Sequence, residues 1–211
     1  MSNCYVLFKS LFYLYLHSLH FNIILSSFNW MRRISIKLGL FFESVGTMTG
    51  LLLLFLAQDS SNSILSNSFL IFISMLFLWY FPHCLLHYVI GKLFKINFLY
   101  FRIAPSNLIK SSSNLYFTKL LKIFPVLGLS VDKNGLSSIN HIHLILMYSS
   151  GVIGSMLFPL IISIYAFITL LFPYYLPHIF FSLSNIVITL FFSPKFGDFY
   201  RARLVLSKKT V

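Results

Sequence analysis

The stretch SFLIFISMLFLWYFPHCLLHYVIG, residues 68–91, decides the fold of this chain. It contains 24 residues without a Lys, Arg, Asp or Glu, and it ends directly before Lys92. A helix rises about 1.5 Å per residue, so about 20 apolar residues are enough to cross the hydrocarbon core of a bilayer. The stretch therefore predicts a membrane-spanning helix.

Three other apolar runs support the same interpretation. They cover residues 38–57, 142–172 and 176–192. The run 142–172 is longer than one perpendicular crossing needs, and Pro159 inside it indicates a tilted or kinked helix. The composition agrees, because 58% of the residues are hydrophobic and only 9% are charged, against about 25% charged residues in a soluble domain. We expect an all-α, polytopic transmembrane bundle of about four spans, with its membrane domain in residues 38–193.

The basic residues lie at the ends of these runs. Arg32, Arg33 and Lys37 precede the first run, and further Lys and Arg residues occur in the loop 92–141 and in the tail 194–211. The two other segments between runs contain no Lys or Arg. Because cytoplasmic loops carry an excess of basic residues, we expect a protein of the cell membrane with both flanks of its four-span core in the cytoplasm. The formal net charge of +12 is then explained by basic residues at the ends of membrane spans. We therefore expect a lipid bilayer as the partner and do not expect a nucleic acid.

The N-terminal extension, residues 1–37, has two interpretations. Residues 5–28 are apolar enough to form a fifth span or a signal anchor, although one Lys and two His interrupt them. Alternatively, Met31, which two arginines follow, is the true start of the native protein. The sequence leaves both open.

A pair of histidines lies inside the second run. His83 and His87 are four residues apart, so their imidazoles share one face of a helix and can bind one metal ion. Ionisable side chains inside a span are costly, which makes them functional candidates. The alternative is that both are neutral packing residues that hydrogen-bond between helices.

The residues around this pair resemble a known family. Residues 83–98 read HCLLHYVIGKLFKINF, which is similar to the HExxH helix of site-2-protease-like intramembrane zinc metalloproteases. In that family the motif is followed by apolar residues, a basic residue and LLGI, and the matching offsets here hold Lys92, Leu93, Phe94 and Ile96. The resemblance implies that His83 and His87 are zinc ligands.

The end of the chain resembles the same family. Its members carry a late segment rich in Asn and Pro that ends in an Asp, the third zinc ligand. Asn185 and the segment SPKFGD, residues 193–198, are similar to it. By resemblance, Asp198 completes the ligand set with the two histidines.

The chain departs from the family beside the first histidine. Cys84 stands where the family has its catalytic Glu, which accepts a proton from the metal-bound water. A thiol on a shorter side chain is a poor proton shuttle. We therefore expect a degenerate relative without proteolytic activity, which binds zinc and has a binding or regulatory role toward a membrane protein or peptide.

Glu43 is the only acidic residue within the predicted spans. It follows Lys37 by six residues, at a depth similar to that of the histidines. One hypothesis makes Glu43 a surrogate base or an ion-pair partner of the histidines, which would allow an active metalloprotease. The other has its carboxylate extend back toward Lys37. A further interpretation of the chain is a membrane scaffold or a small transport subunit with structural histidines.

The third run contains small residues, and two more histidines lie at its start. Gly151 with Ser155, and Ser150 with Gly154, are small pairs four residues apart that favour close helix packing. The histidines at 141 and 143 are two residues apart, so they lie on different helical faces and a joint metal role is not expected.

Overall fold

The computed structural model describes residues 32–59, 63–105, 125–132 and 139–207 of the chain. The chain divides into two compact units, residues 1–32 with 103–126 and residues 33–102 with 127–211. All the helices below belong to the second unit. The candidate fifth span and the alternative start at Met31 lie outside the described residues.

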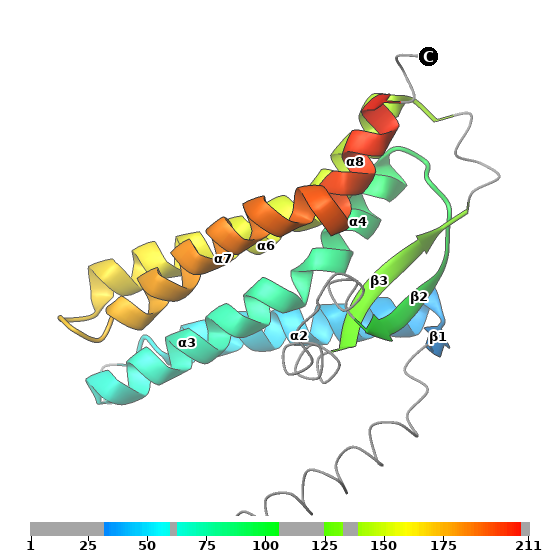
Figure 1. The fold of residues 1–211 in the computed structure, drawn as a ribbon. Helices are drawn as coiled ribbons and strands as arrows, with labels where there is room; N and C mark the ends of the chain where they lie inside the picture. The colour runs from blue at the N-terminus through cyan, green and yellow to red at the C-terminus, as the bar shows by residue number, and fades with distance from the viewer. Residues whose placement is uncertain (1–31, 60–62, 106–124, 133–138, 208–211) are drawn as a thin grey trace, which may run out of the picture. The chain divides into compact units, whose positions relative to one another are not determined.

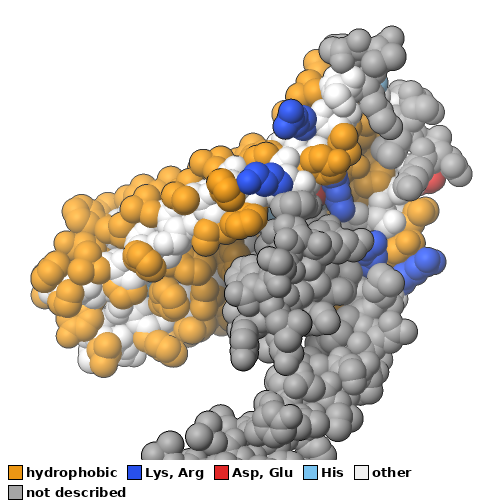
Figure 2. Space-filling view, in the orientation of Figure 1, with side chains coloured by type: hydrophobic (Ala, Val, Ile, Leu, Met, Phe, Trp, Pro, Cys, Tyr) orange, Lys and Arg blue, Asp and Glu red, His pale blue; other side chains and the backbone are white. Residues whose placement is uncertain are grey.

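Four long helical segments are apolar enough to cross a membrane. The first is α2 (Ile36–Leu56), the second combines α3 (Ile64–Tyr80) with α4 (Pro82–Leu93), the third is α6 (His141–Thr169), and the fourth is formed by α7 (Leu176–Phe196) (Figure 1). The predicted all-α bundle with four spans is therefore confirmed, and it is consistent with a multi-pass membrane protein. In Figure 2 hydrophobic side chains cover most of the exposed helix surface, as expected for lipid-facing helices.

The second span is interrupted at Phe81, which ends α3 and precedes α4. Pro82 is the first residue of α4, where the missing N–H of proline is tolerated and its fixed φ angle suits a helix start. In Figure 1 the helix axis changes direction at this point. The break places His83 in the first turn of α4, away from the long apolar part of the span.

Small residues set the distances between the helices. Gly46 on α2 contacts the ring of Phe81, and a Cβ atom at this position would overlap the ring. Ser74 on α3 donates its hydroxyl to the Gly50 carbonyl of α2 at 2.7 Å. The helix α6 contacts α3, α4, α7 and the short C-terminal helix α8 (Asp198–Ser207), so it is the central element around which the functional residues gather.

The region predicted as the loop 92–141 contains two strands, β2 (Phe98–Pro105) and β3 (Pro125–Val131). Together with β1 (Arg32–Ile34) they form a three-stranded sheet in the order β1-β2-β3. The sequence does not predict these strands, because short strands are stabilised mainly by partners distant in sequence. The predicted basic tail also begins differently: α7 continues to Phe196, and α8 follows after Gly197.

Candidate metal centre

His87 is the buried member of the histidine pair on α4. Its Nδ1 atom lies 2.6 Å from the backbone carbonyl oxygen of Met147 on α6. A carbonyl oxygen only accepts, so Nδ1 of His87 carries the proton and donates it. Its Nε2 atom lies on the opposite side of the ring, toward His83 and Asp198.

His83 lies one helical turn before His87 and is held in a similar way. Its Nδ1 atom is 2.9 Å from the Ser155 hydroxyl oxygen on α6. The Ser155 backbone is held in turn by Asn185 on α7, whose amide donates to the Ser155 carbonyl at 2.8 Å. The two imidazole planes are nearly perpendicular, at 88°, and their Nε2 atoms are 3.2 Å apart.

The third residue, Asp198, is the first residue of α8. The Ser193 hydroxyl accepts the backbone N–H of Phe199 at 3.2 Å, and the Gly197 N–H donates to the Ser193 carbonyl at 2.9 Å. These bonds fix the start of α8, where the positive end of the helix dipole favours a carboxylate. Asp198 Oδ2 lies 3.2 Å from Nε2 of both His83 and His87.

The three atoms form an almost equilateral triangle with edges of 3.2 Å. A zinc ion with tetrahedral ligands at about 2.0–2.1 Å requires ligand atoms about 3.3 Å apart. The triangle matches this requirement and leaves the fourth position of the tetrahedron without a ligand from the described residues. His83, His87 and Asp198 are therefore placed so that they could hold one metal ion.

The surroundings of the three atoms also suit a cation. Burial raises the pKa of Asp198, but hydrogen bonds from His83 and His87 lower it more, so its net pKa lies well below the ordinary value and the group is a carboxylate. Arg201 contacts the other carboxylate oxygen, Oδ1, at 3.2 Å. The Nδ1 atoms of both rings have hydrogen-bond partners on α6. In metal-bound histidines the ring nitrogen that does not bind the metal commonly has such a partner. An imidazole lone pair and a carboxylate that converge in this way need a cation or a proton between them.

Cys84 occupies a different face of α4. Its side chain is 2% exposed, and its thiol donates to the backbone carbonyl of Leu127 on β3 at 3.2 Å. The Cys84 side chain is thus buried against a strand that the sequence does not predict.

Glu43 does not extend to Lys37. Its side chain is only 1% exposed, and neither carboxylate oxygen has a well-formed hydrogen bond among the described residues, although the Leu85 backbone N–H of α4 lies near the carboxylate. The hypothesis of a carboxylate that reaches Lys37 is therefore wrong, because α2 buries this face against its neighbours. No ion pair joins Glu43 to His83 or His87 in the described part of the chain.

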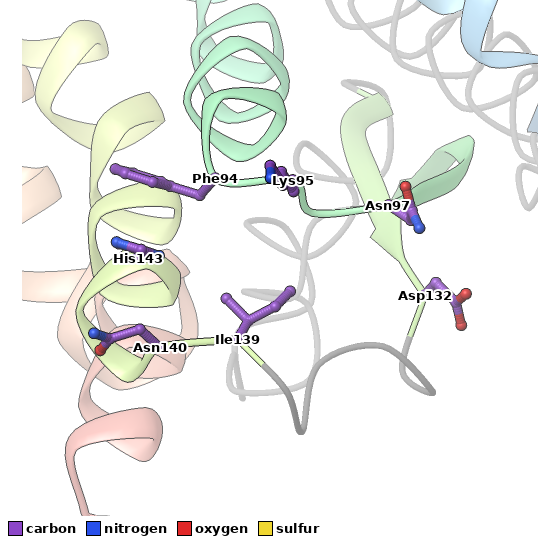
Figure 3. Close-up of a pocket in the computed structure, with 7 residues that line it drawn as sticks. All are labelled: Phe94, Lys95, Asn97, Asp132, Ile139, Asn140 and His143. Carbon is purple, nitrogen blue, oxygen red and sulfur yellow. The ribbon is translucent and has the colours of Figure 1, made fainter.

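The histidines at the start of α6 take no part in the centre. His143 stacks on Phe94, with ring centroids 4.0 Å apart and planes 5° from parallel. Both rings line a separate pocket of about 440 Å³. Figure 3 shows its lining residues: Phe94, Lys95, Asn97, Asp132, Ile139, Asn140 and His143. This pocket contains none of the three residues of the candidate metal centre.

Sequence reasoning missed the residues that support the centre. Ser155 was interpreted only as a small packing residue, and neither the Met147 carbonyl nor Arg201 carries a recognisable signal in one sequence. The i, i+3 spacing of Asp198 and Arg201 could have indicated their contact, because residues three apart are neighbours on a helix. Comparisons with protein-family models, with curated proteins and with solved structures found no match to this chain.

Proposed function

We propose that this chain is a multi-pass protein of the cell membrane that binds one zinc ion through His83, His87 and Asp198. The observation that supports this proposal most strongly is the 3.2 Å triangle of two imidazole nitrogens and one carboxylate oxygen. Two nitrogens and one oxygen are a ligand set that zinc accepts readily. The basic residues near the centre, such as Lys92 and Arg201, favour a location at the cytoplasmic side of the bundle.

The proposed role is binding or regulation, without peptide hydrolysis. A zinc ion with three protein ligands has an open position that an oxygen of a peptide or membrane-protein partner can occupy. Hydrolysis would also need a base beside the metal. Cys84, at the position of the family's base, is turned to the Leu127 carbonyl. His83, His87 and Asp198 would then orient a bound partner instead of cleaving it.

The direct test is the metal content of the purified protein. We expect about one zinc per chain after purification in detergent without chelators, measured by elemental mass spectrometry. A variant with His141→Ala and His143→Ala should keep its zinc, because these residues lie outside the triangle. If the wild-type chain contains no zinc and takes up none from solution, the proposed function is wrong.

Ser155→Ala should weaken zinc binding without abolishing it. The substitution removes the partner of His83 Nδ1, so the ring loses its fixed orientation and its preferred tautomer. Changes to such outer partners typically cost about 10- to 100-fold in metal affinity. Competition with a chromophoric chelator measures the affinity, and Ser163→Ala is a matched control on the same helix, since its hydroxyl bonds to the Leu160 carbonyl, away from the centre. Equal affinities of the two variants would contradict the assignment of Ser155.

A second candidate is an active metalloprotease with a relocated base. The observation that favours it is the buried, unpaired carboxylate of Glu43 on the helix next to α4. The two candidates differ in an assay of the zinc-loaded protein with a membrane-embedded peptide. Cleavage that Glu43→Gln abolishes would establish the protease, whereas an intact peptide that remains bound supports the role in binding.

A further inference from the structure

Glu43 has no neutralising partner in the described structure. It is the only acidic residue in the four spans and is almost completely buried. Neither carboxylate oxygen has a well-formed hydrogen bond in the described structure, although the Leu85 backbone N–H of α4 lies near the carboxylate. A charged carboxylate in such surroundings is costly unless a cation or a hydrogen-bond donor compensates it. Glu43 therefore calls for a physical explanation beyond helix packing.

The groups around Glu43 connect it to the metal centre. Its helix α2 packs against α3 and α4, and the titratable side chains of these helices that interact with it electrostatically are Tyr80 and Cys84. The Cys84 thiol lies within electrostatic range of both Glu43 and Asp198. Glu43 thus lies beside α4 near Leu85, which stands between His83 and His87 in the sequence.

The charge of an occupied centre provides the explanation. A divalent ion held by two neutral imidazoles and one carboxylate keeps one positive charge, and Arg201 beside Asp198 adds another. In a bundle surrounded by lipid this excess is poorly screened, so a nearby anion stabilises it. Of the acids in the described spans only Glu43 is available for this role.

We propose that Glu43 is the proton-exchanging counter-charge of the metal centre. In the metal-free protein its carboxyl group carries a proton and is neutral. When zinc binds to the three ligands, this proton leaves to solvent and the carboxylate balances one positive charge. The inference rests on the proposed function, and it makes zinc binding depend on pH through a residue that does not touch the metal.

The first test counts protons released on zinc binding. Isothermal titration calorimetry of the full chain in detergent, in two buffers of different protonation enthalpy at the same pH, gives the number of protons released per zinc. We expect wild type to release about one proton more than Glu43→Gln, and the variant to bind zinc on the order of tenfold more weakly. The control Asp132→Asn removes an acid outside the spans and should match wild type. Equal release from wild type and Glu43→Gln overturns this inference alone, whereas a wild-type chain that binds no zinc overturns the proposed function itself.

The second test needs no variant and so does not depend on how Glu43→Gln folds. Dicyclohexylcarbodiimide reacts with protonated carboxyl groups in apolar surroundings: the acid proton adds to a carbodiimide nitrogen, the carboxylate oxygen bonds to the central carbon, and the O-acylisourea rearranges to a stable N-acylurea. We expect labelling of Glu43 in the chelator-treated protein and protection by zinc, detected by peptide mass spectrometry. No labelling of the metal-free protein, or labelling that zinc leaves unchanged, would show that the proposed exchange is wrong.

Discussion

We expect Asp198→Asn to lower the zinc affinity by more than about 100-fold. The substitution keeps the shape of the side chain but removes the negative charge that two imidazoles and a guanidinium surround. Loss of an outer partner alone costs up to about 100-fold, so loss of an anionic ligand should exceed that value. Competition with a chelator of known affinity provides the measurement.

Two controls separate the loss of a ligand from the loss of structure. Asp132→Asn makes the same charge change outside the spans and should leave the affinity unchanged. Arg201→Gln removes the ion pair between Arg201 and Asp198 but keeps the Asp198 carboxylate. Because Arg201 is 46% exposed, this ion pair should contribute little to zinc affinity. The zinc affinity of this variant should stay within about tenfold of wild type. If Asp198→Asn and Asp132→Asn bind zinc equally, Asp198 is no ligand.

The helices could be predicted from the sequence because each span is a continuous apolar run. Hydropathy measures the same property that stabilises a helix in lipid, so the run 68–91 was sufficient to indicate its span. The same uniformity hides the interior face, since α2 is apolar on every side around Glu43. That Glu43 turns inward, away from Lys37, depends on the glycines that bring α2 close to its neighbours, such as Gly46 against Phe81.

The candidate site was predictable only in part, for a reason of distance along the chain. Helical spacing alone places His83 and His87 on one face. Asp198 is 111 residues beyond His87, and only a family resemblance indicated it. The outer partners on α6 have no motif of their own, because a backbone carbonyl such as that of Met147 can belong to any residue. The positions of these outer partners follow from tertiary packing, which the local sequence does not reveal.

Gly151→Ala should disrupt the metal centre, although the residue donates no ligand. A Cβ atom at this position would lie against the His87 imidazole and 2.7 Å from the His83 carbonyl oxygen. Neither group can yield easily, because the backbone of α4 is rigid and the His87 ring is held by its bond to Met147. The methyl group must therefore push α6 away from α4, and with it Ser155 and the Met147 carbonyl.

Gly154→Ala is the matched control on the same helix. A Cβ atom at Gly154 would meet chiefly the end of the Leu86 side chain, which can change its rotamer. Both substitutions gain about 1 kcal/mol of helix propensity, but only Gly151→Ala also forces backbone apart, at a cost of about 1–3 kcal/mol. We expect Gly154→Ala to be neutral or slightly stabilising in thermal unfolding in detergent. Gly151→Ala should unfold at a lower temperature and bind zinc at least about tenfold more weakly, since both histidines lose their outer partners. If the two variants have equal stability and equal zinc affinity, the close approach of α4 and α6 does not position the ligands.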